Sequence, residues 1–362
     1  AEVNDIKITS PLIDIKKNNN LFFVNGQVLN DNKVFDIKEL KNIFANLLTN
    51  IDIKKIEFHS TNNFSFTINK NFKFNDFKLK TIINLKQLIL NEKNLKLKSY
   101  LPNFIEEIKF ENHIVTINYN KKKFEIKGNG NILLEDKLDS LSYQIISNKN
   151  YLTFESKINL TKNPLIIDFL DYKKKEDVSS LIILKGKFKE NSGIKFDLIS
   201  LKEGDNKILI KGLDLNKNLK ILDIEFFDVN YINNKNFLNK INLIKDNTIF
   251  TIEGVSFDSS KIINKIIDND DKSSSIFGGL NSTINIKIKK TYIDDVNYIN
   301  NLYGNIKFDD NKMIQLNLES TFPGNKRVKL SITTNEKSET ITKLFSDNPK
   351  ALIKRYDFIK GF

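Results

Sequence analysis

The sequence contains neither cysteine nor tryptophan, and its 362 residues include only two histidines and one methionine. Without cysteine the chain can form neither disulfides nor thiolate metal sites. The two histidines, His59 and His113, are far apart in the sequence, so a histidine-based nucleophilic or metal centre is hard to assemble from them. We therefore predict no metal ion and no cofactor, and we interpret both histidines as surface or rim residues of a sheet.

Long apolar runs are also missing. No stretch of about 18 or more apolar residues occurs, so the sequence holds no transmembrane helix. The chain begins at Ala1 without the charged and apolar regions of a signal peptide. It ends at Gly361 and Phe362, directly after a helical pattern. We expect it to be a piece of a longer protein, or a processed form, whose anchoring segments lie outside it.

Arginine is scarce although the chain is strongly basic. The net charge is +12, yet the 57 lysines and arginines include only two arginines, Arg327 and Arg355. Recognition of phosphates and base edges favours the forked guanidinium group, whereas lysine supplies a point charge. The lysines mostly occupy alternate strand positions, which is typical of a solvated face. We predict no nucleic-acid partner; a weak attraction to anionic lipid head groups is compatible with the same charge.

What the sequence does contain is an alternation of apolar and polar residues. It is cleanest at residues 283–289, 313–319 and 327–333. Because successive side chains of a strand point to opposite faces, a period of two gives one apolar and one polar face. Similar runs recur about every ten residues, with short turns between them, which predicts an all-β architecture. We expect the sheet to be antiparallel.

A few segments depart from this alternation. Residues 37–48 follow a capping box that begins at Asp36, and they predict a first helix. An isoleucine-rich helix is predicted after a cap at Asp258 or Ser259. Residues 79–97 fit a helix and two long strands nearly equally well, and both interpretations stay open.

The sequence contains no recognisable pattern of catalytic residues. The acid pairs at 270–271 and 294–295 occupy loop or turn positions, where aspartate accepts hydrogen bonds from backbone amides, and neither has the spacing of a calcium-binding loop. Gly128-Asn-Gly130 lacks the Gly-Lys-Ser/Thr that completes a phosphate loop. We therefore predict that the chain is not an enzyme and has no catalytic residues.

The many predicted strands each contribute one apolar face, whereas amphipathic helices that could cover it are few. Such a sheet must close into a sandwich or barrel, or curl into a trough whose apolar lining faces a ligand. A trough could hold acyl chains, at roughly 0.8 kcal/mol per buried CH₂. Alternation does not separate the two arrangements. If the face lines a trough, the residues expected to contact lipid are Ile284, Ile286, Ile288, Ile306, Phe308, Ile314, Leu316, Leu318, Val328, Leu330 and Ile332.

The C-terminal part resembles a known family. Thr251-Ile-Glu-Gly-Val-Ser-Phe-Asp258, followed by the isoleucine-rich helix, a polar loop and three amphipathic strands, is similar to the AsmA-like C-terminal region of bacterial envelope proteins. The chain departs from the family pattern at Pro349, which a first helical turn tolerates, and at Phe362, where the family has a second glycine. The resemblance covers residues 195–362. The positions that match in the closing helical element are Ser346-Asp347, Leu352-Ile353, Tyr356-Asp357, Ile359 and Gly361.

The family, which includes YhdP-type and TamB-type proteins, is understood as long β-rich bridges that carry phospholipid between the inner and outer membranes of Gram-negative bacteria. The resemblance implies an elongated, twisted antiparallel sheet curled into a hydrophobic groove (half-pipe), with a few short helices. It also implies a periplasmic location, an inner-membrane anchor outside this chain, and outer-membrane or envelope proteins as further partners. We expect residues 1–194 to be a β-rich groove segment by continuity and 195–362 to be the AsmA-like segment, together one continuous unit.

A second hypothesis stays open at this point. A structural or adhesive envelope β-protein with a closed core would bind protein partners through its sheet edges and would hold no lipid. A glycan hydrolase comes third, and it would need a clustered acid pair inside a pocket. Whether the sheet is open or closed decides between the first two.

Overall fold

The computed structural model describes residues 2–3, 6–38, 52–92, 97–121, 123–148, 150–175, 177–189, 192–219, 221–261, 282–309, 312–334, 339–350 and 352. The chain divides into two compact units. Unit 1 comprises Ala1–Leu165 and Lys175–Glu190, and unit 2 comprises Ile166–Lys174 and Asn191–Phe362. Both units are built almost entirely of strands, so the predicted mainly-β class is confirmed.

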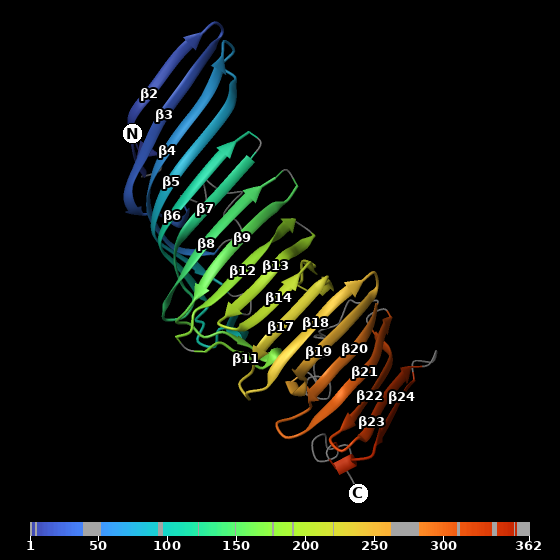
Figure 1. The fold of residues 1–362 in the computed structure, drawn as a ribbon. Helices are drawn as coiled ribbons and strands as arrows, with labels where there is room; N and C mark the ends of the chain where they lie inside the picture. Colours follow the sequence, from blue (N-terminus) through green and yellow to red (C-terminus); the bar gives the residue numbers. More distant parts are fainter. Residues whose placement is uncertain are drawn as a thin grey trace. The chain divides into compact units, whose positions relative to one another are not determined.

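In unit 1 the strands from β2 to β9 follow one another across an antiparallel sheet, each paired with the next along the chain (Figure 1). β1 pairs with the start of β2, and β9 pairs with β12. One short 3₁₀ helix, η1 (Leu97–Ser99), follows β5. The strands are β1 (Glu2–Val3), β2 (Ile6–Asn18), β3 (Leu21–Val34), β4 (Ile53–Asn69), β5 (Phe74–Asn91), β6 (Glu107–Asn120), β7 (Lys123–Leu133), β8 (Leu138–Ser147), β9 (Leu152–Leu160) and β12 (Ser180–Lys189).

Asparagine closes several hairpins of unit 1. Asn19, between β2 and β3, has a φ of 51°, a left-handed conformation that asparagine tolerates because its short side chain bonds locally. The side chain of Asn69 accepts backbone N–H bonds from Asn71 and Lys73, each at 3.0 Å. Asn120 accepts one from Lys123, also at 3.0 Å. Tight turns of this kind fix the register of the long strands that follow.

In unit 2 the sheet runs from β13 through β14, β17 and β18 to β19, and then to β24 in sequence (Figure 1). The short strand β15 pairs with β13 on the same side as β14, and β16 pairs with β15. A separate small sheet pairs β10 (Ile166–Ile167) with β11 (Tyr172–Lys173) around η2 (Asp168–Leu170). The strands of the large sheet are β13 (Gly193–Glu203), β14 (Asn206–Lys211), β15 (Leu213–Leu215), β16 (Ile221–Asp223), β17 (Phe226–Ile232), β18 (Leu238–Asp246), β19 (Ile249–Asp258), β20 (Ser282–Tyr292), β21 (Tyr298–Asp309), β22 (Lys312–Phe322), β23 (Lys326–Thr334) and β24 (Thr340–Ser346).

One pair in unit 2 is parallel, so the expectation of a wholly antiparallel sheet is wrong there. β19 and β20 run in the same direction, with Phe250 opposite Ile284 and Ile252 opposite Ile286. Parallel neighbours need a connection of a dozen or more residues, because a tight hairpin reverses the chain. Residues 259–281, for which the sequence predicts a helix and a polar loop, join the two strands. The sheet of unit 2 is therefore mixed.

The predicted helices lie mostly outside the described residues. Ile37 and Lys38 are helical, and Asp36 Oδ1 accepts a hydrogen bond from the Lys38 N–H at 2.7 Å, as a helix cap does. Ser260 and Lys261 are also helical. The remainder of both predicted helices falls on residues that are not described.

The segment 79–97, which the sequence leaves open between helix and strand, is a strand as far as Asn91. β5 presents apolar side chains on both faces, because Ile82 and Ile83 follow one another and point in opposite directions. This mixture of faces is what made the sequence pattern ambiguous. Leu97, at the end of the segment, begins η1.

Neither sheet closes on itself among the described strands. In unit 1, β2 pairs with β1 and β3; in unit 2, β24 pairs with β23 alone among the described strands. Buried apolar clusters form where another segment folds over a sheet. In unit 1 the segment after η1 contributes to a cluster of Leu101, Phe104, Ile132, Leu134, Leu141 and Leu160. In unit 2 two clusters contain Phe250 with Ile284, and Ile293 with Phe322 and Val328.

Candidate functional site

A row of apolar side chains crosses the sheet of unit 2 from β13 to β24. Residues paired across neighbouring strands lie on the same face, so the register joins them into one line. Nine steps of about 4.8 Å between strands make the line roughly 43 Å long. We call it the central apolar row, and its members are Ile199, Ile210, Phe227, Leu243, Ile252, Ile286, Leu318, Leu330 and Leu344, with Gly304 between Ile286 and Leu318.

The central apolar row is partly exposed along its whole length. None of its members is fully buried, and Leu344 at the β24 end is 43% exposed. The row next to it is better covered, since Phe250 and Ile284 are each only 2% exposed and Leu316 is 8% exposed. On the other side Ile288 is also buried. Solvent thus reaches the central apolar row, whereas positions on both sides of the row are buried.

All eleven residues that we predicted to contact lipid lie on β20 to β23. The register assigns Ile286, Leu318 and Leu330 to the central apolar row. A neighbouring row contains Ile284, Ile306, Leu316 and Ile332. Ile288 and Val328 follow on the other side of the central apolar row, and Phe308 and Ile314 lie at a register shift between β21 and β22. The sequence analysis did not name the members on β13 to β19 and β24, although the same alternation marks several of them.

Unit 1 has an apolar face of the same kind, which the sequence analysis did not name residue by residue. All members of two neighbouring rows are half-buried or exposed. One row comprises Phe64, Leu79, Tyr119 and Phe124. The next comprises Ile117, Ile126, Ile145 and Phe154. The segment after η1 covers one end of this apolar face, whereas the side chains of the two rows remain partly exposed.

Glycines allow large rings to approach the sheet of unit 1. A Cβ built on any of three strand glycines would collide with a ring of the neighbouring strand. A strand glycine with this role supports close packing, which agrees with the exclusion of a phosphate loop at Gly128-Asn-Gly130. The pairs are Gly26 with Phe64, Gly128 with Tyr143 and Gly130 with His113.

The polar face of unit 1 carries ion pairs both between neighbouring strands and within a strand. Lys86 Nζ lies 2.6 Å from Glu57, and its hydrogen bond lowers the pKa of that carboxyl below the ordinary value. Within β7, Lys127 lies 3.1 Å from Glu125 and its hydrogen bond lowers the pKa of that carboxyl in the same way. Lysines that pair with carboxylates along a sheet are typical of a solvated face, as the alternation indicated.

A hollow of about 590 Å³ opens over β2 to β6 of unit 1. Polar and apolar side chains both line it. The polar ones include Lys78 and Lys80, and the apolar ones are Leu12 and three members of a partly exposed apolar row, Phe64, Leu79 and Tyr119. Its lining contains no carboxylate and no histidine, so it offers neither an acid pair for glycan hydrolysis nor ligands for a metal ion.

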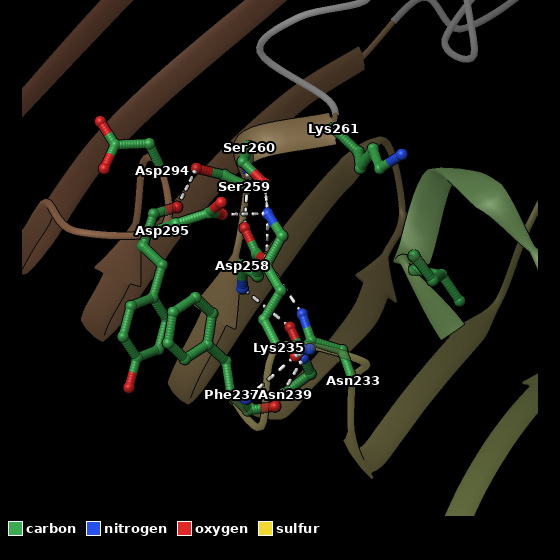
Figure 2. Close-up of polar contacts among 12 residues, drawn as sticks. Asn233, Lys235, Phe237, Asn239, Asp258, Ser259, Ser260, Lys261, Asp294 and Asp295 are labelled. Carbon is green, nitrogen blue, oxygen red and sulfur yellow. Dashed lines mark hydrogen bonds and ion pairs between the residues drawn. The ribbon is translucent and has the colours of Figure 1, made fainter. Parts of the chain in front are cut away.

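A buried polar cluster in unit 2 surrounds Asp258 at the end of β19 (Figure 2). Asp258 is 3% exposed and accepts hydrogen bonds from Asn233 Nδ2 at 2.9 Å and from the Ser260 N–H at 3.0 Å. Its own N–H donates to Asn239 Oδ1 at 2.7 Å. The Asp258 carboxylate therefore links Ser260, where the helix after β19 begins, to Asn233 in the β17–β18 hairpin.

Lys235 supplies the positive charge of this cluster. Its Nζ lies 3.6 Å from Asp258 Oδ2 and 2.6 Å from Asp295 Oδ1, and it donates to Ser260 Oγ at 3.1 Å (Figure 2). Burial opposes the charged form, but the hydrogen bond to Asp295 and the charge of Asp258 outweigh it and raise the pKa of Lys235. Because Lys235 pairs with both carboxylates and the remaining bonds of Asp258 go to Asn233 and Ser260, we assign the cluster a structural role.

The structure shows the surroundings of one acid pair and of both histidines, which the sequence analysis interpreted as non-catalytic. Asp294 caps a turn by accepting the N–H groups of Val296 and Asn297 at 2.8 and 2.6 Å, as expected. His59 is exposed, also as expected. The interpretation of His113 as a surface or rim residue is wrong, since it is 1% exposed. The acid pair at 270–271 lies outside the described residues.

Within the described residues, no group of three or more histidines and carboxylates could hold a metal ion. None of the helices in the same residues is long and apolar enough to cross a membrane.

No family model and no solved structure matches the chain. The beta sliding clamp of Mycoplasma genitalium is 30% identical over 151 residues, which is 41% of this chain and 35% of the clamp. A match over so small a part of that protein does not show a family.

Proposed function

We propose that the chain carries phospholipid along its apolar faces, as a segment of a bridge between the inner and outer membranes of a bacterial envelope. The observation that carries the proposal is the central apolar row of unit 2. Its nine apolar side chains stand in one register across ten neighbouring strands, with Gly304 on the remaining strand, and all nine are partly exposed. A continuous exposed apolar surface of this length is typical of a binding site.

The proposed mechanism is passive. Acyl chains lie along the central apolar row and gain roughly 0.8 kcal/mol for each CH₂ that leaves water. The better-covered positions beside the row, such as Ile284 and Ile288, form the walls of a half-pipe groove, and head groups stay in the water at its opening. No bond is made or broken, so the path needs no catalytic residue.

Two further points support this proposal over its alternatives. A structural or adhesive protein with a closed core would bury the central apolar row, whereas Ile286, Leu318 and Leu330 are all partly exposed. Glycan hydrolysis would need a clustered acid pair in a pocket, and the hollow of unit 1 has no carboxylate in its lining. The periplasmic location and the inner-membrane anchor rest on the resemblance of residues 195–362 alone.

The proposal is tested by placing a charge on the central apolar row. Ile286→Asp introduces a carboxylate at a half-buried position, and Asn285→Asp introduces the same group one residue away on the exposed polar face. Each purified protein is incubated with phosphatidylcholine vesicles and re-isolated, and its lipid content is measured by mass spectrometry. We expect Ile286→Asp to lose lipid about fivefold or more, because acyl chains desolvate the new charge. Equal loading of the two variants, with unchanged circular dichroism, would refute the proposal.

A further inference from the structure

Lys290 lies at one end of the apolar face of unit 2. On β20 it follows Ile284, Ile286 and Ile288 at every second position, so it projects from the same face. Its partner in the register is Asn300 on β21. The ammonium group therefore stands beside the apolar path, two residues beyond Ile288 and at the next position of the same face.

Two other lysines on this face are each neutralised by a carboxylate. Lys245 Nζ lies 2.5 Å from Asp223, and Lys195 Nζ lies 3.4 Å from Glu225. For Lys290, in contrast, none of the described carboxylates comes within ion-pair distance. A positive charge next to an apolar surface gains most from an opposite charge, and here the protein does not provide one from the described residues.

Aromatic rings hold the Lys290 ammonium in place instead. Its Nζ lies 4.6 Å from the ring centroid of Tyr292 and 4.1 Å from that of Tyr298. The Tyr292 ring is itself stacked on Phe237, with centroids 3.9 Å apart and planes 5° from parallel. A cation–π contact attracts the ammonium without neutralising it. Lys290 is thus half-buried and positioned by two tyrosine rings.

We infer that Lys290 is the head-group anchor of the lipid path in unit 2, and that it gives the path a preference for lipids with a net negative head group. The inference rests on the proposed function, since it assumes that acyl chains occupy the neighbouring apolar row. A phosphate or a second anionic group at Lys290 would complete the missing ion pair, while the acyl chains pass the covered Ile288 and lie on the central apolar row at Ile286.

The experiment compares the uptake of two lipids by one protein. The purified 362-residue chain is incubated with vesicles that contain equal amounts of phosphatidylglycerol and phosphatidylcholine, re-isolated, and extracted for mass spectrometry. We expect the wild-type chain to be enriched in phosphatidylglycerol. Lys290→Gln should reduce this enrichment by about three- to tenfold and leave phosphatidylcholine uptake unchanged. Lys290→Arg should retain it, because arginine keeps both the charge and the contact with the tyrosine rings.

Lys289→Gln is the matched control, because Lys289 is the neighbouring lysine on the exposed opposite face. It should behave as the wild type does. If Lys289→Gln and Lys290→Gln reduce the enrichment equally, the preference comes from net charge and the assignment of Lys290 is overturned. Uptake of both lipids without any preference overturns the assignment alone. Uptake of neither lipid by the wild-type chain overturns the proposed function, and the head-group anchor with it.

Discussion

The imidazole ring of His113 lies against the backbone of Gly130 on the neighbouring strand, where any Cβ would overlap the ring. Its Nε2 is hydrogen-bonded to the carbonyl oxygen of Asn131 at 2.8 Å. The ring centroids of Phe110 and Tyr143 lie 5.5 and 5.9 Å away. A histidine therefore fills a place on the apolar face of unit 1 that would otherwise suit an apolar side chain.

Gly130→Ala should destabilise the protein by about 1–3 kcal/mol, because the new methyl group displaces the His113 ring. In a His113→Ala background the same substitution should cost clearly less, since the ring is absent. The free energy of unfolding from urea titrations of the four proteins measures both costs. Equal costs in the two backgrounds would show that the ring and the glycine are not coupled.

Stability should fall on mild acidification because of His113. Burial lowers the pKa of the His113 imidazole in the folded protein below 6.5, and its hydrogen bond to Asn131 offsets this only in part. Above pH 6.5 both the folded and unfolded forms are neutral, and the stability is complete. As the pH falls through 6.5 toward the folded pKa, the unfolded chain takes up a proton that the folded protein does not, so the free energy of unfolding decreases.

Urea titrations at pH 7.5 and 5.5 measure this loss of stability. His113→Phe should reduce the difference between the two pH values, because the group that titrates is gone. His59→Gln is the control, since His59 is exposed and should leave the difference nearly as it is in the wild type. An unchanged difference in His113→Phe would assign the pH dependence to other groups.

The strands could be predicted from the sequence because alternation reports which residues share a face. This was sufficient for Ile284, Ile286 and Ile288, which occupy one face of β20 as expected. Alternation carries no information on strand direction, and the parallel pairing of β19 with β20 was therefore missed. It also does not report whether another segment covers the face, so the difference between the buried Ile284 and the half-buried Ile286 required the structure.

The buried cluster around Asp258 could not be predicted for a different reason. Asn233 and Asn239 are common residues of turns, and nothing in the local pattern distinguishes them from the other asparagines of the chain. Only the folding of the β17–β18 hairpin beside β19 brings them to Asp258. The sequence did identify Asp258 as a possible helix cap, and its bond to the Ser260 N–H agrees with that expectation.

Asp258→Ala should lower the free energy of unfolding by about 3–5 kcal/mol, because it leaves buried donors of Asn233 and Ser260 without an acceptor. Asp295→Ala removes the other carboxylate near Lys235, but Asp295 is largely exposed and its loss should cost less than about 1 kcal/mol. Thermal and urea unfolding of the two variants measure the difference. An equal loss of unfolding free energy in the two variants would mean that the buried bonds of Asp258 do not stabilise the start of the helix.

In unit 2 a charged substitution should destabilise the protein more in the buried row that contains Leu316 than in the central apolar row. Leu316→Asp buries an unpaired carboxylate at a position that is 8% exposed, and it should cost about 3–5 kcal/mol or prevent folding. Ile286→Asp lies on the partly exposed row and should leave the far-UV circular dichroism unchanged. If Ile286→Asp unfolds the protein as readily as Leu316→Asp, the central apolar row belongs to a closed core.

The most direct test of lipid carriage is the lipid content of the protein as it is isolated. The chain is purified without detergent, extracted with organic solvent, and the extract is analysed by mass spectrometry against a stable isotope standard. We expect phospholipid in a stoichiometric amount in the wild-type protein and a strongly reduced amount in Ile286→Asp. A wild-type extract without phospholipid, from protein whose circular dichroism shows an intact sheet, would contradict the account.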